Sequence, residues 1–178
     1  MSDLVKIAKI EISNSNKLCV IAGLNVLEDD QLTFEVAERL KKITEAQGNS
    51  FIFKASFDKA NRSSVDSYRG PGLEKGLEIF RELKKSDYQL ITDIHEISQV
   101  EQISEVVDII QIPAFLCRQT DLIKEACQSG KPLNIKKGQF LSPDQMKNII
   151  EKCSNFGNDQ IMLCERGTSF GYDNLVVD

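Results

Sequence analysis

Cationic, amide and hydroxyl side chains gather in one segment of this chain, which reads FKASFDKANRSS at positions 53–64 and YRGPG at positions 68–72. Three cations, Lys54, Lys59 and Arg62, lie within nine residues, although the whole chain carries a formal net charge of −5. Cations and hydroxyls at the end of an apolar strand are typical of a phosphate site. Long loops without structure of their own are also commonly functional. Each residue alone fits a solvated basic turn, but together they predict an anion-binding site.

The overall composition excludes several other classes of function. The chain has 178 residues, 41% hydrophobic and 28% charged, which is typical of a globular domain with an apolar core. Its pI near 5.1 argues against nucleic acid as the main partner, because phosphate backbones require a basic surface. No apolar run approaches the ~20 residues that cross a membrane, and the first six residues lack the apolar core of a signal peptide. Five cysteines without a C-x-x-C pair indicate reduced thiols, so we expect a cytoplasmic protein.

Short apolar runs alternate with helical patterns along the chain. The runs cover positions 18–24, 51–53, 89–94, 107–112, 133–135 and 161–164. The helices are marked by apolar stripes: Leu32, Val36, Leu40 and Ile43; Leu73, Leu77, Phe80 and Leu83; Val100, Ile103 and Val107; Leu122, Ile123 and Ala126; Met146, Ile149, Ile150 and Cys153. Six strands that alternate with five helices predict βαβ units and a parallel sheet.

Two further local features complete this assignment. Ser142 and Pro143 are typical of a helix N-cap and first helical position, and therefore predict the start of the fifth helix. Before the first βαβ unit, positions 6–12 and 17–21 flank Asn14, Ser15 and Asn16. This pattern suggests a small N-terminal hairpin.

Successive side chains of a strand point to opposite faces, so one parity of each strand shares a face. On that face each predicted strand carries a polar residue near its carboxyl end: Asn25, Lys54, Asp93, Gln111, Lys136 and Arg166. Six such residues predict a converging polar mouth. Active sites of α/β barrels lie at this end of the strands, and so do the ligands of open doubly wound sheets. Strand polarity alone therefore leaves both folds open.

The same residues resemble a known family, 3-deoxy-D-manno-octulosonate 8-phosphate synthase, also called 2-dehydro-3-deoxyphosphooctonate aldolase. The matching stretches are FKASFDKANRSSVDSYRGPG (53–72), ITDIHE (91–96), QIPAFLCRQTD (111–121), NIKKGQF (134–140) and CERGTSFGYDNLVVD (164–178). They are collinear and together highly specific. The resemblance implies a (β/α)8 TIM barrel, with residues 1–178 forming one partial domain of an N-terminal hairpin and about six β/α units. It also implies condensation of phosphoenolpyruvate with D-arabinose 5-phosphate, for the lipopolysaccharide inner core of Gram-negative bacteria.

A complete barrel of this kind needs about 250 residues. The 178 residues here extend only through the sixth predicted strand and the GYDNLVVD segment. An unclosed barrel leaves unpaired strand edges, which proteins normally avoid. We therefore expect a partial sequence, whose function is that of the complete protein.

The resemblance also assigns roles to individual residues. Lys54, Lys59, Lys136 and Arg166 would hold the phosphoenolpyruvate carboxylate and phosphate, and Asn61, Arg62 and Ser63 would hold the sugar phosphate. Ser56, Gln111 and Ala114 would complete the substrate site, and Asn25 and Asp93 would orient and polarise the reacting groups alongside Lys59 and Lys136. Arg118 would reach the sugar phosphate of a neighbouring subunit in a homotetramer. No residue stands out as a general base, and His95 equally fits a hydrogen-bonded histidine at a strand end.

Asn25 bears on metal use. In metal-dependent members of the family a cysteine occupies this position and binds a divalent ion, whereas asparagine marks the metal-independent class. An amide oxygen is a poor ligand for a thiolate-type site. We therefore expect no metal ion and no other cofactor.

Other functions remain open from the residues. Lys54 or Lys136 could form a Schiff base with a carbonyl substrate, and crowding by other cations would lower the pKa of such a lysine. An aromatic-pathway synthase that uses erythrose 4-phosphate would share the barrel but lack the KANRSS signature. A third alternative is a noncatalytic fragment that acts as a phosphate-binding or assembly module. The S-x-x-K pattern of Ser56 and Lys59 matches serine acyl enzymes, but no S-D-N or K-T-G follows it.

Overall fold

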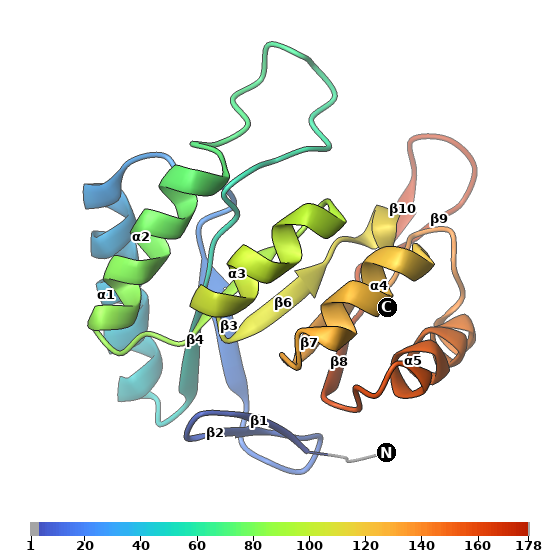
Figure 1. The fold of residues 1–178 in the computed structure, drawn as a ribbon, viewed down its shortest axis with the longest axis horizontal. Helices are drawn as coiled ribbons and strands as arrows, with labels where there is room; N and C mark the ends of the chain where they lie inside the picture. The colour runs from blue at the N-terminus through green and yellow to red at the C-terminus, as the bar shows by residue number, and fades with distance from the viewer. Residues whose placement is uncertain (1–3, 178) are drawn as a thin grey trace.

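The computed structural model describes residues 4–177 and contains one six-stranded parallel sheet in the order β3-β4-β5-β6-β7-β8 (Figure 1). Its strands are β3 (Cys19–Gly23), β4 (Ser50–Lys54), β5 (Leu90–Asp93), β6 (Ile109–Ile112), β7 (Leu133–Lys136) and β8 (Ile161–Cys164). All six strands were predicted from the sequence, with ends that differ by one or two residues. The N-terminal residues 1–3, used above in the argument about a signal peptide, and Asp178 lie outside the described residues.

Five helices follow these strands: α1 (Asp30–Ala46), α2 (Leu73–Lys85), α3 (Val100–Val106), α4 (Thr120–Gln128) and α5 (Met146–Asn155). The helices lie along one side of the sheet (Figure 1). Since each strand leads through a helix to the neighbouring parallel strand, the sheet curls into part of a barrel. The predicted α/β class and partial TIM barrel are therefore confirmed.

The register of the sheet separates two apolar layers. Phe53, Leu90, Ile110, Leu133 and Ile135 belong to the large core that includes residues of the helices. Residues of the other parity form a second core inside the curled sheet: Ile52, Ile91 and Ile109, with Ile21 and Met162 packed against them. The inner face was predicted correctly by strand parity.

The N-terminal hairpin differs from the prediction. It pairs β1 (Val5–Ile7) with β2 (Ile10–Ile12) around Ala8, which adopts a positive φ of 49°. Positions 17–21 instead lead into β3 of the main sheet. Val5 and Ile7 pack against the inner apolar layer, so burial on the inner layer accounts for the actual pairing. The hairpin lies at the amino-terminal end of the strands (Figure 1).

Two helix predictions also need correction. Val36 and Leu40 of the predicted stripe of α1 pack against the core, but Ile43 is 55% exposed, and the fully buried residues of the helix are Thr33, Ala37 and Thr44. Both sets have helical spacing, and the small side chains of the buried set let the helix lie close to the sheet. At Pro143 the chain forms a 3-10 turn, Pro143–Gln145, and α5 begins only at Met146.

The carboxyl ends of the strands carry the long loop between β4 and α2 and the small hairpin of β9 (Thr168–Ser169) with β10 (Leu175–Val176). Both project from the end of the sheet opposite the N-terminal hairpin (Figure 1). Among residues 4–177, no helix is long and apolar enough to cross a membrane. The division of the chain into a single domain stays a prediction.

Candidate active site

Asp93, the last residue of β5, lies at the centre of the candidate site. Ser56 Oγ and Gln111 Nε2 donate short hydrogen bonds to its two carboxylate oxygens. The Nζ atoms of Lys54 and Lys59 lie 3.5 and 3.7 Å from Asp93 Oδ2. Asp93 is 4% exposed, so these charges interact with little screening by water. The structure thus brings together five of the residues predicted from the sequence.

Hydrogen bonds extend this arrangement across four neighbouring strands. Ser56 Oγ accepts hydrogen bonds from Lys54 Nζ at 2.9 Å and from Lys59 Nζ at 3.0 Å. On the other side, Asn134 Nδ2 donates to Gln111 Oε1 at 3.0 Å. Below, the term Asp93 cluster denotes these six residues: Lys54, Ser56, Lys59, Asp93, Gln111 and Asn134.

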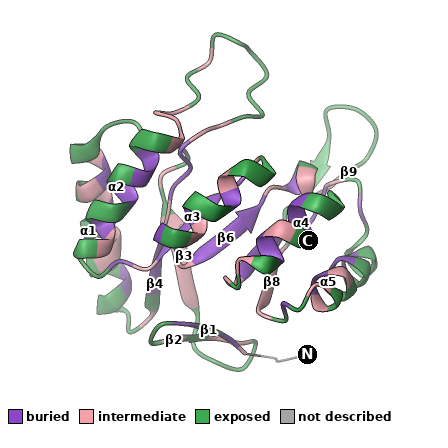
Figure 2. Cartoon of the chain, in the orientation of Figure 1, coloured by how far each residue is buried: buried purple, intermediate pink, exposed green. Residues whose placement is uncertain are grey.

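The loop that carries Lys59 is fixed at its base. Arg69 Nε donates to Asp58 Oδ1 at 2.8 Å, and Nη2 of the same guanidinium donates to Oδ2. The backbone N–H of Lys59 donates to the carbonyl of Arg69 at 2.6 Å. A bidentate arginine–carboxylate pair has a defined geometry, so it holds the two ends of the loop side by side. Residues 60–68 then project from this base as an exposed tip (Figure 2).

Two glycines allow α2 and this loop to approach Phe57. A Cβ on Gly76 would lie 2.5 Å from Phe57 Cβ, and one on Gly70 would lie 2.3 Å from Phe57 O. Gly70 also has a φ of 122°, which other residues rarely adopt. Phe57 is 1% exposed and is two residues from Lys59. The close packing of Gly70 and Gly76 against Phe57 therefore fixes the backbone that leads to Lys59.

The pKa of Asp93 reflects opposing effects. Burial alone would raise the pKa of this carboxyl, but the charge of Lys54 and the hydrogen bond from Ser56 outweigh burial and lower it to about 2. Asp93 is therefore ionised throughout the neutral range and accepts hydrogen bonds from its neighbours.

The two lysines show the complementary effect. Burial lowers the pKa of Lys54 to about 8, with further lowering by the charges of Lys59 and Lys136, while Asp93 opposes the shift. Burial likewise lowers the pKa of Lys59, again opposed by Asp93. The cluster thus holds two ammonium groups in a site where, without Asp93, they would lose protons more readily.

A cavity of about 330 Å³ opens beside the cluster. It is lined by Lys59, Ala60, Asn61, Asp93, His95, Glu96, Pro113, Ala114, Phe115, Leu116, Lys136, Gln139 and Arg166. Three cations in its wall, Lys59, Lys136 and Arg166, come from the ends of different strands. Lys136 also lines a larger cavity of about 810 Å³ inside the curled sheet, together with Lys54 and Gln111. These cavities offer room for anionic ligands beside several cations.

His95 lies in the wall of the smaller cavity. Its ring packs edge-on against Phe57 with centroids 5.7 Å apart, and burial lowers the pKa of the imidazole. Its Nδ1 is buried and has no hydrogen-bond partner among residues 4–177. The backbone N–H of His95 donates to Gln99 Oε1 at 2.8 Å, which fixes the residue just beyond the end of β5.

Several predicted site residues do not contact the cluster. Asn25 follows β3 at the same end of the sheet, where its side chain is exposed. Arg62 Nε donates to the carbonyl of Tyr68 at 3.2 Å, and Ser63 is exposed on the loop tip. Arg118 lines a separate cavity beside α5 with Leu141, Gln145, Asn148, Ile149 and Lys152. Their predicted roles stay predictions.

The sequence argument missed two residues of this region. Asn134 was on the inward parity of β7 and could have been included on that ground. Lys137, which is 2% exposed, directly follows Lys136 on the opposite parity. Its burial depends on loops distant in sequence, so periodicity carried no signal for it.

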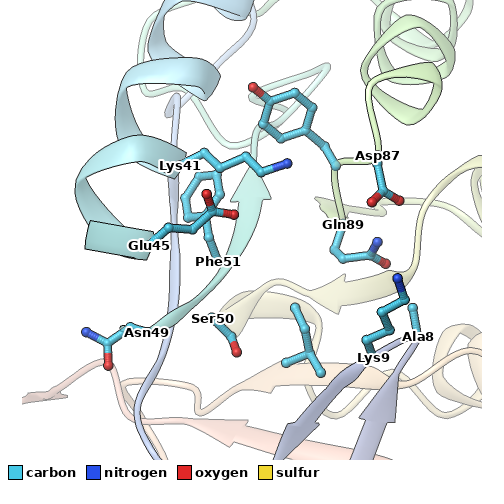
Figure 3. A pocket seen from close by; sticks show the side chains of 11 residues that line it. Ala8, Lys9, Lys41, Glu45, Asn49, Ser50, Phe51, Asp87 and Gln89 are labelled. Carbon is cyan, nitrogen blue, oxygen red and sulfur yellow. The ribbon is translucent and has the colours of Figure 1, made fainter. Parts of the chain in front are cut away.

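Another cavity, of about 360 Å³, lies at the opposite end of the sheet beside the N-terminal hairpin (Figure 3). Its wall carries both signs of charge, with Lys9 and Lys41 near Glu45 and Asp87. It therefore lacks the concentration of cations found around Asp93. Within residues 4–177 there is also no group of three or more His, Cys, Asp or Glu side chains that could hold a metal ion.

The sequence was also compared with protein families and with individual known proteins. A model of the DAHP synthetase I family matches residues 3–178. This chain belongs to the DAHP synthetase I family. It is 54% identical to a 2-dehydro-3-deoxyphosphooctonate aldolase of Haemophilus influenzae (strain PittEE) over 176 residues. It is 56% identical to the protein of that name from Bdellovibrio bacteriovorus and 53% identical to the one from Pseudomonas syringae pv. syringae. The resemblance seen in the sequence motifs is confirmed.

These alignments cover 98% of the chain and 61–63% of the length of each relative. The matched region contains all six strands of the sheet and the complete Asp93 cluster. The chain thus spans less than two thirds of the length of these relatives.

The Asp93 cluster predicts a specific dependence of stability on pH. Because the folded-state pKa of Asp93 is about 2, below its ordinary 3.8, its stabilisation is complete above about pH 4 and is lost as the pH falls toward 2. Asp93→Asn should cost about 3 kcal/mol at pH 7, since it leaves buried lysines without a counter-charge. Urea unfolding should show the gap to wild type narrowing between pH 4 and pH 2.

Glu151→Gln is a suitable control, because Glu151 is exposed on α5. Its stability should follow that of the wild type over the whole range. A gap between Asp93→Asn and wild type that stays constant from pH 5 to pH 2 would contradict the role given to the Asp93 carboxylate.

Proposed function

We propose that the protein condenses phosphoenolpyruvate with D-arabinose 5-phosphate to form 3-deoxy-D-manno-octulosonate 8-phosphate and phosphate. The observation that carries this proposal is the assembly of Lys54 and Lys59 around the buried Asp93, with Lys136 and Arg166 in the adjoining walls. The names of the relatives and the KANRSS segment support the choice of substrates. On this proposal the enzyme is cytoplasmic and supplies lipopolysaccharide inner-core biosynthesis.

The proposed substrates require such a site on electrostatic grounds. Phosphoenolpyruvate carries a phosphate and a carboxylate, and arabinose 5-phosphate carries a second phosphate. Two like charges about 4 Å apart repel by about 4 kcal/mol at an effective dielectric constant near 20. Cations placed in advance around both substrates offset this repulsion and avoid the cost of reorganising water during the reaction.

The geometry supports a division of roles between the strand ends and the loop. Lys54, Lys59, Lys136 and Arg166 would hold the carboxylate and phosphate of phosphoenolpyruvate. Asn61 lines the same cavity, and the neighbouring Arg62 and Ser63 on the loop tip would hold the sugar phosphate. Ser56 and Gln111 would keep the Asp93 carboxylate in place, and Ala114 would form part of the apolar wall.

In the proposed reaction, C3 of phosphoenolpyruvate forms a bond with the aldehyde carbon of the sugar, and one water molecule adds to C2. The C–O bond to phosphate then breaks in the tetrahedral intermediate and releases inorganic phosphate. The protein must hold the two substrates in line, polarise the aldehyde and admit one water. Asn25 and Asp93 would orient the sugar and the water, while the lysines stabilise the developing negative charge.

One observation favours an alternative chemistry. The pKa of Lys54 is lowered to about 8, so this lysine is partly neutral near physiological pH. A neutral lysine can form a Schiff base with a carbonyl substrate. The alternative is therefore a Schiff-base aldolase with Lys54 as the nucleophile.

The condensation and the Schiff-base reaction differ in the substrates they require, and only the second forms a covalent bond between Lys54 and the substrate. We expect the full-length protein to release phosphate only when phosphoenolpyruvate and arabinose 5-phosphate are both present, because each occupies its own part of the site. A continuous phosphate assay with each substrate alone and with both together measures this.

Replacement of arabinose 5-phosphate by erythrose 4-phosphate is the matched control and should reduce turnover at least a hundredfold. Equal turnover with both sugars would reject the substrate assignment. Borohydride should trap no substrate adduct, and a trapped adduct on Lys54 would instead establish the Schiff-base alternative.

We also propose that this reaction needs no metal ion, on the basis of Asn25. Its amide oxygen is a weaker ligand for Zn²⁺ or Mn²⁺ than a thiolate. Incubation with a chelator followed by removal of the chelator should leave the turnover rate within about twofold of the untreated enzyme. A loss of activity that Mn²⁺ or Zn²⁺ restores would contradict the role of Asn25.

We further propose a homotetramer in which Arg118 completes the site of a neighbouring subunit. Arg118 is exposed and lines a cavity beside α5, away from Asp93 and Lys59. Phe115, three residues before it, is 57% exposed, and an interface would cover this apolar side chain. These features support a role for Arg118 outside its own site.

Arg118→Ala should weaken binding of arabinose 5-phosphate about ten- to a hundredfold, because a charged hydrogen bond is worth about 1.5–3 kcal/mol. Binding of phosphoenolpyruvate should change less than twofold. Calorimetric titration of each substrate measures both effects.

Mixed oligomers test whether Arg118 acts across an interface. Subunits with Arg118→Ala, mixed with subunits carrying Arg62→Ala, should form some sites that contain both wild-type arginines, so that activity partly returns. If mixed oligomers form and no activity returns, Arg118 serves its own barrel.

A further inference from the structure

Lys137 occupies an unusual environment directly behind the candidate site. Its side chain is 3% exposed, and its Nζ lies 2.9 Å from the carbonyl oxygen of Gly167 and 3.2 Å from that of Leu141. Thr168 Oγ1 and the carbonyl of Gly138 lie at 3.3 and 3.4 Å. An ammonium has three donors, so these four oxygens are enough to satisfy it.

This cage joins two loops that are about 30 residues apart in the sequence. Gly138 and Leu141 follow β7, whereas Gly167 and Thr168 follow β8. Two backbone hydrogen bonds support the same junction: Lys137 N–H donates to Cys164 O at 2.9 Å, and Ser169 N–H donates to Gln139 O at 3.1 Å. The Lys137 ammonium thus contacts oxygens of both loops.

Glu165 connects the cage to Arg166. One oxygen of the Glu165 carboxylate, Oε1, accepts hydrogen bonds from the backbone N–H groups of Arg166 at 2.8 Å and Gly167 at 2.6 Å. The same oxygen lies 3.4 Å from Lys137 Nζ. Lys137 therefore contacts both the carboxylate that fixes the turn at Arg166 and the carbonyl that follows this turn.

The position of this turn determines where Arg166 can reach. Arg166, an exposed residue in the loop after β8, lines the cavity together with Lys136. Lys136 is the last residue of β7 and lines the cavity, whereas the side chain of the next residue, Lys137, fills the cage. One pair of adjacent lysines thus provides a cation for the site and an anchor for the opposing arginine.

We propose that Lys137 is a positioning residue that holds Arg166 opposite Lys136, and so sets the affinity of the site for the phosphate group of its substrate. The proposal rests on the function proposed above. It predicts that loss of Lys137 matters only as long as Arg166 is present to be positioned. If the Lys137 charge acted only through its electric field, its loss would weaken anion binding equally with or without Arg166.

A double-mutant cycle in the full-length protein separates these possibilities, with inorganic phosphate as the probe in calorimetric titration. Lys137→Met keeps much of the side-chain volume and removes the charge and the donors. It should weaken phosphate binding about tenfold in the wild-type background and less than twofold in the Arg166→Gln background. An equal loss in both backgrounds would overturn the proposal.

Lys147→Met is the matched control. The side chain of Lys147 is 76% exposed on α5, where it pairs with Asp144, so its loss should leave phosphate binding unchanged. A comparable loss of affinity in this control would show that any removed lysine charge weakens binding, and would also overturn the proposal.

A second variant covers the case in which Lys137→Met fails to fold. Glu165→Gln keeps an oxygen that can accept from the two backbone N–H groups but removes the charge that Lys137 contacts. It should weaken phosphate binding about threefold in the wild-type background and not in the Arg166→Gln background. Equal losses in the two backgrounds would again count against positioning.

Kinetics add a readout that a general loss of structure would not reproduce. Lys137→Met should raise the KM for phosphoenolpyruvate about tenfold while the KM for arabinose 5-phosphate stays within twofold. Equal increases for both substrates would contradict the proposal. If no condensation occurs even in the wild type, the proposed function fails, and the phosphate cycle still tests Lys137.

Discussion

The site depends on one buried carboxylate that balances more positive charge than its own. Asp93 contacts Lys54 and Lys59 and is fixed by Ser56 and Gln111. Two ammonium groups so close together would repel each other and lose protons in an apolar environment. The carboxylate allows them to stay charged before any ligand arrives. Preorganised cations of this kind favour an anion because little rearrangement remains when it binds.

The charge balance is incomplete, so the two lysines favour an anion as the ligand of the candidate site. Burial holds the pKa of Lys54 near 8 in spite of Asp93, so the protonated state of this lysine is only modestly favoured at neutral pH. A phosphate or carboxylate beside Lys54 would raise the pKa of this lysine and so keep it fully protonated. By linkage, anion affinity should weaken as the pH rises above about 8, where the free site begins to lose this proton. Lys54 can therefore attract an anion in its protonated form and could form a Schiff base in its neutral form.

Strand parity correctly predicted that Lys54, Asp93 and Gln111 share the inward face of neighbouring strands, because the two-residue period determines the direction of each side chain. The rest required information that the local sequence does not contain. The hairpin pairs through Ala8, not through Asn14 to Asn16, because its partner is chosen by burial of Val5 and Ile7 on the inner layer. Lys137 has the outward parity of β7, and only the loop after β8 explains why a lysine is buried there. Arg118 was singled out by resemblance, and its exposed position is decided by tertiary structure.

The site also combines residues held within the sheet with residues held by loops beyond the strand ends. Asp93, Gln111 and Asn134 lie on the central strands and are buried, so hydrogen bonds between neighbouring strands fix them directly. Asn25 and Arg166 lie beyond the ends of β3 and β8, in the loops that follow these strands, so their positions depend on contacts between loops. Near Asn25 the backbone N–H of Leu27 donates to Ser56 O at 2.9 Å, which attaches the β3 loop to the cluster. Beyond β8, the buried ammonium of Lys137 attaches the loop that carries Arg166 to the loop after β7. A side chain that must act precisely from a loop needs an anchor of its own, and this requirement gives a physical reason for a buried lysine behind a cationic site.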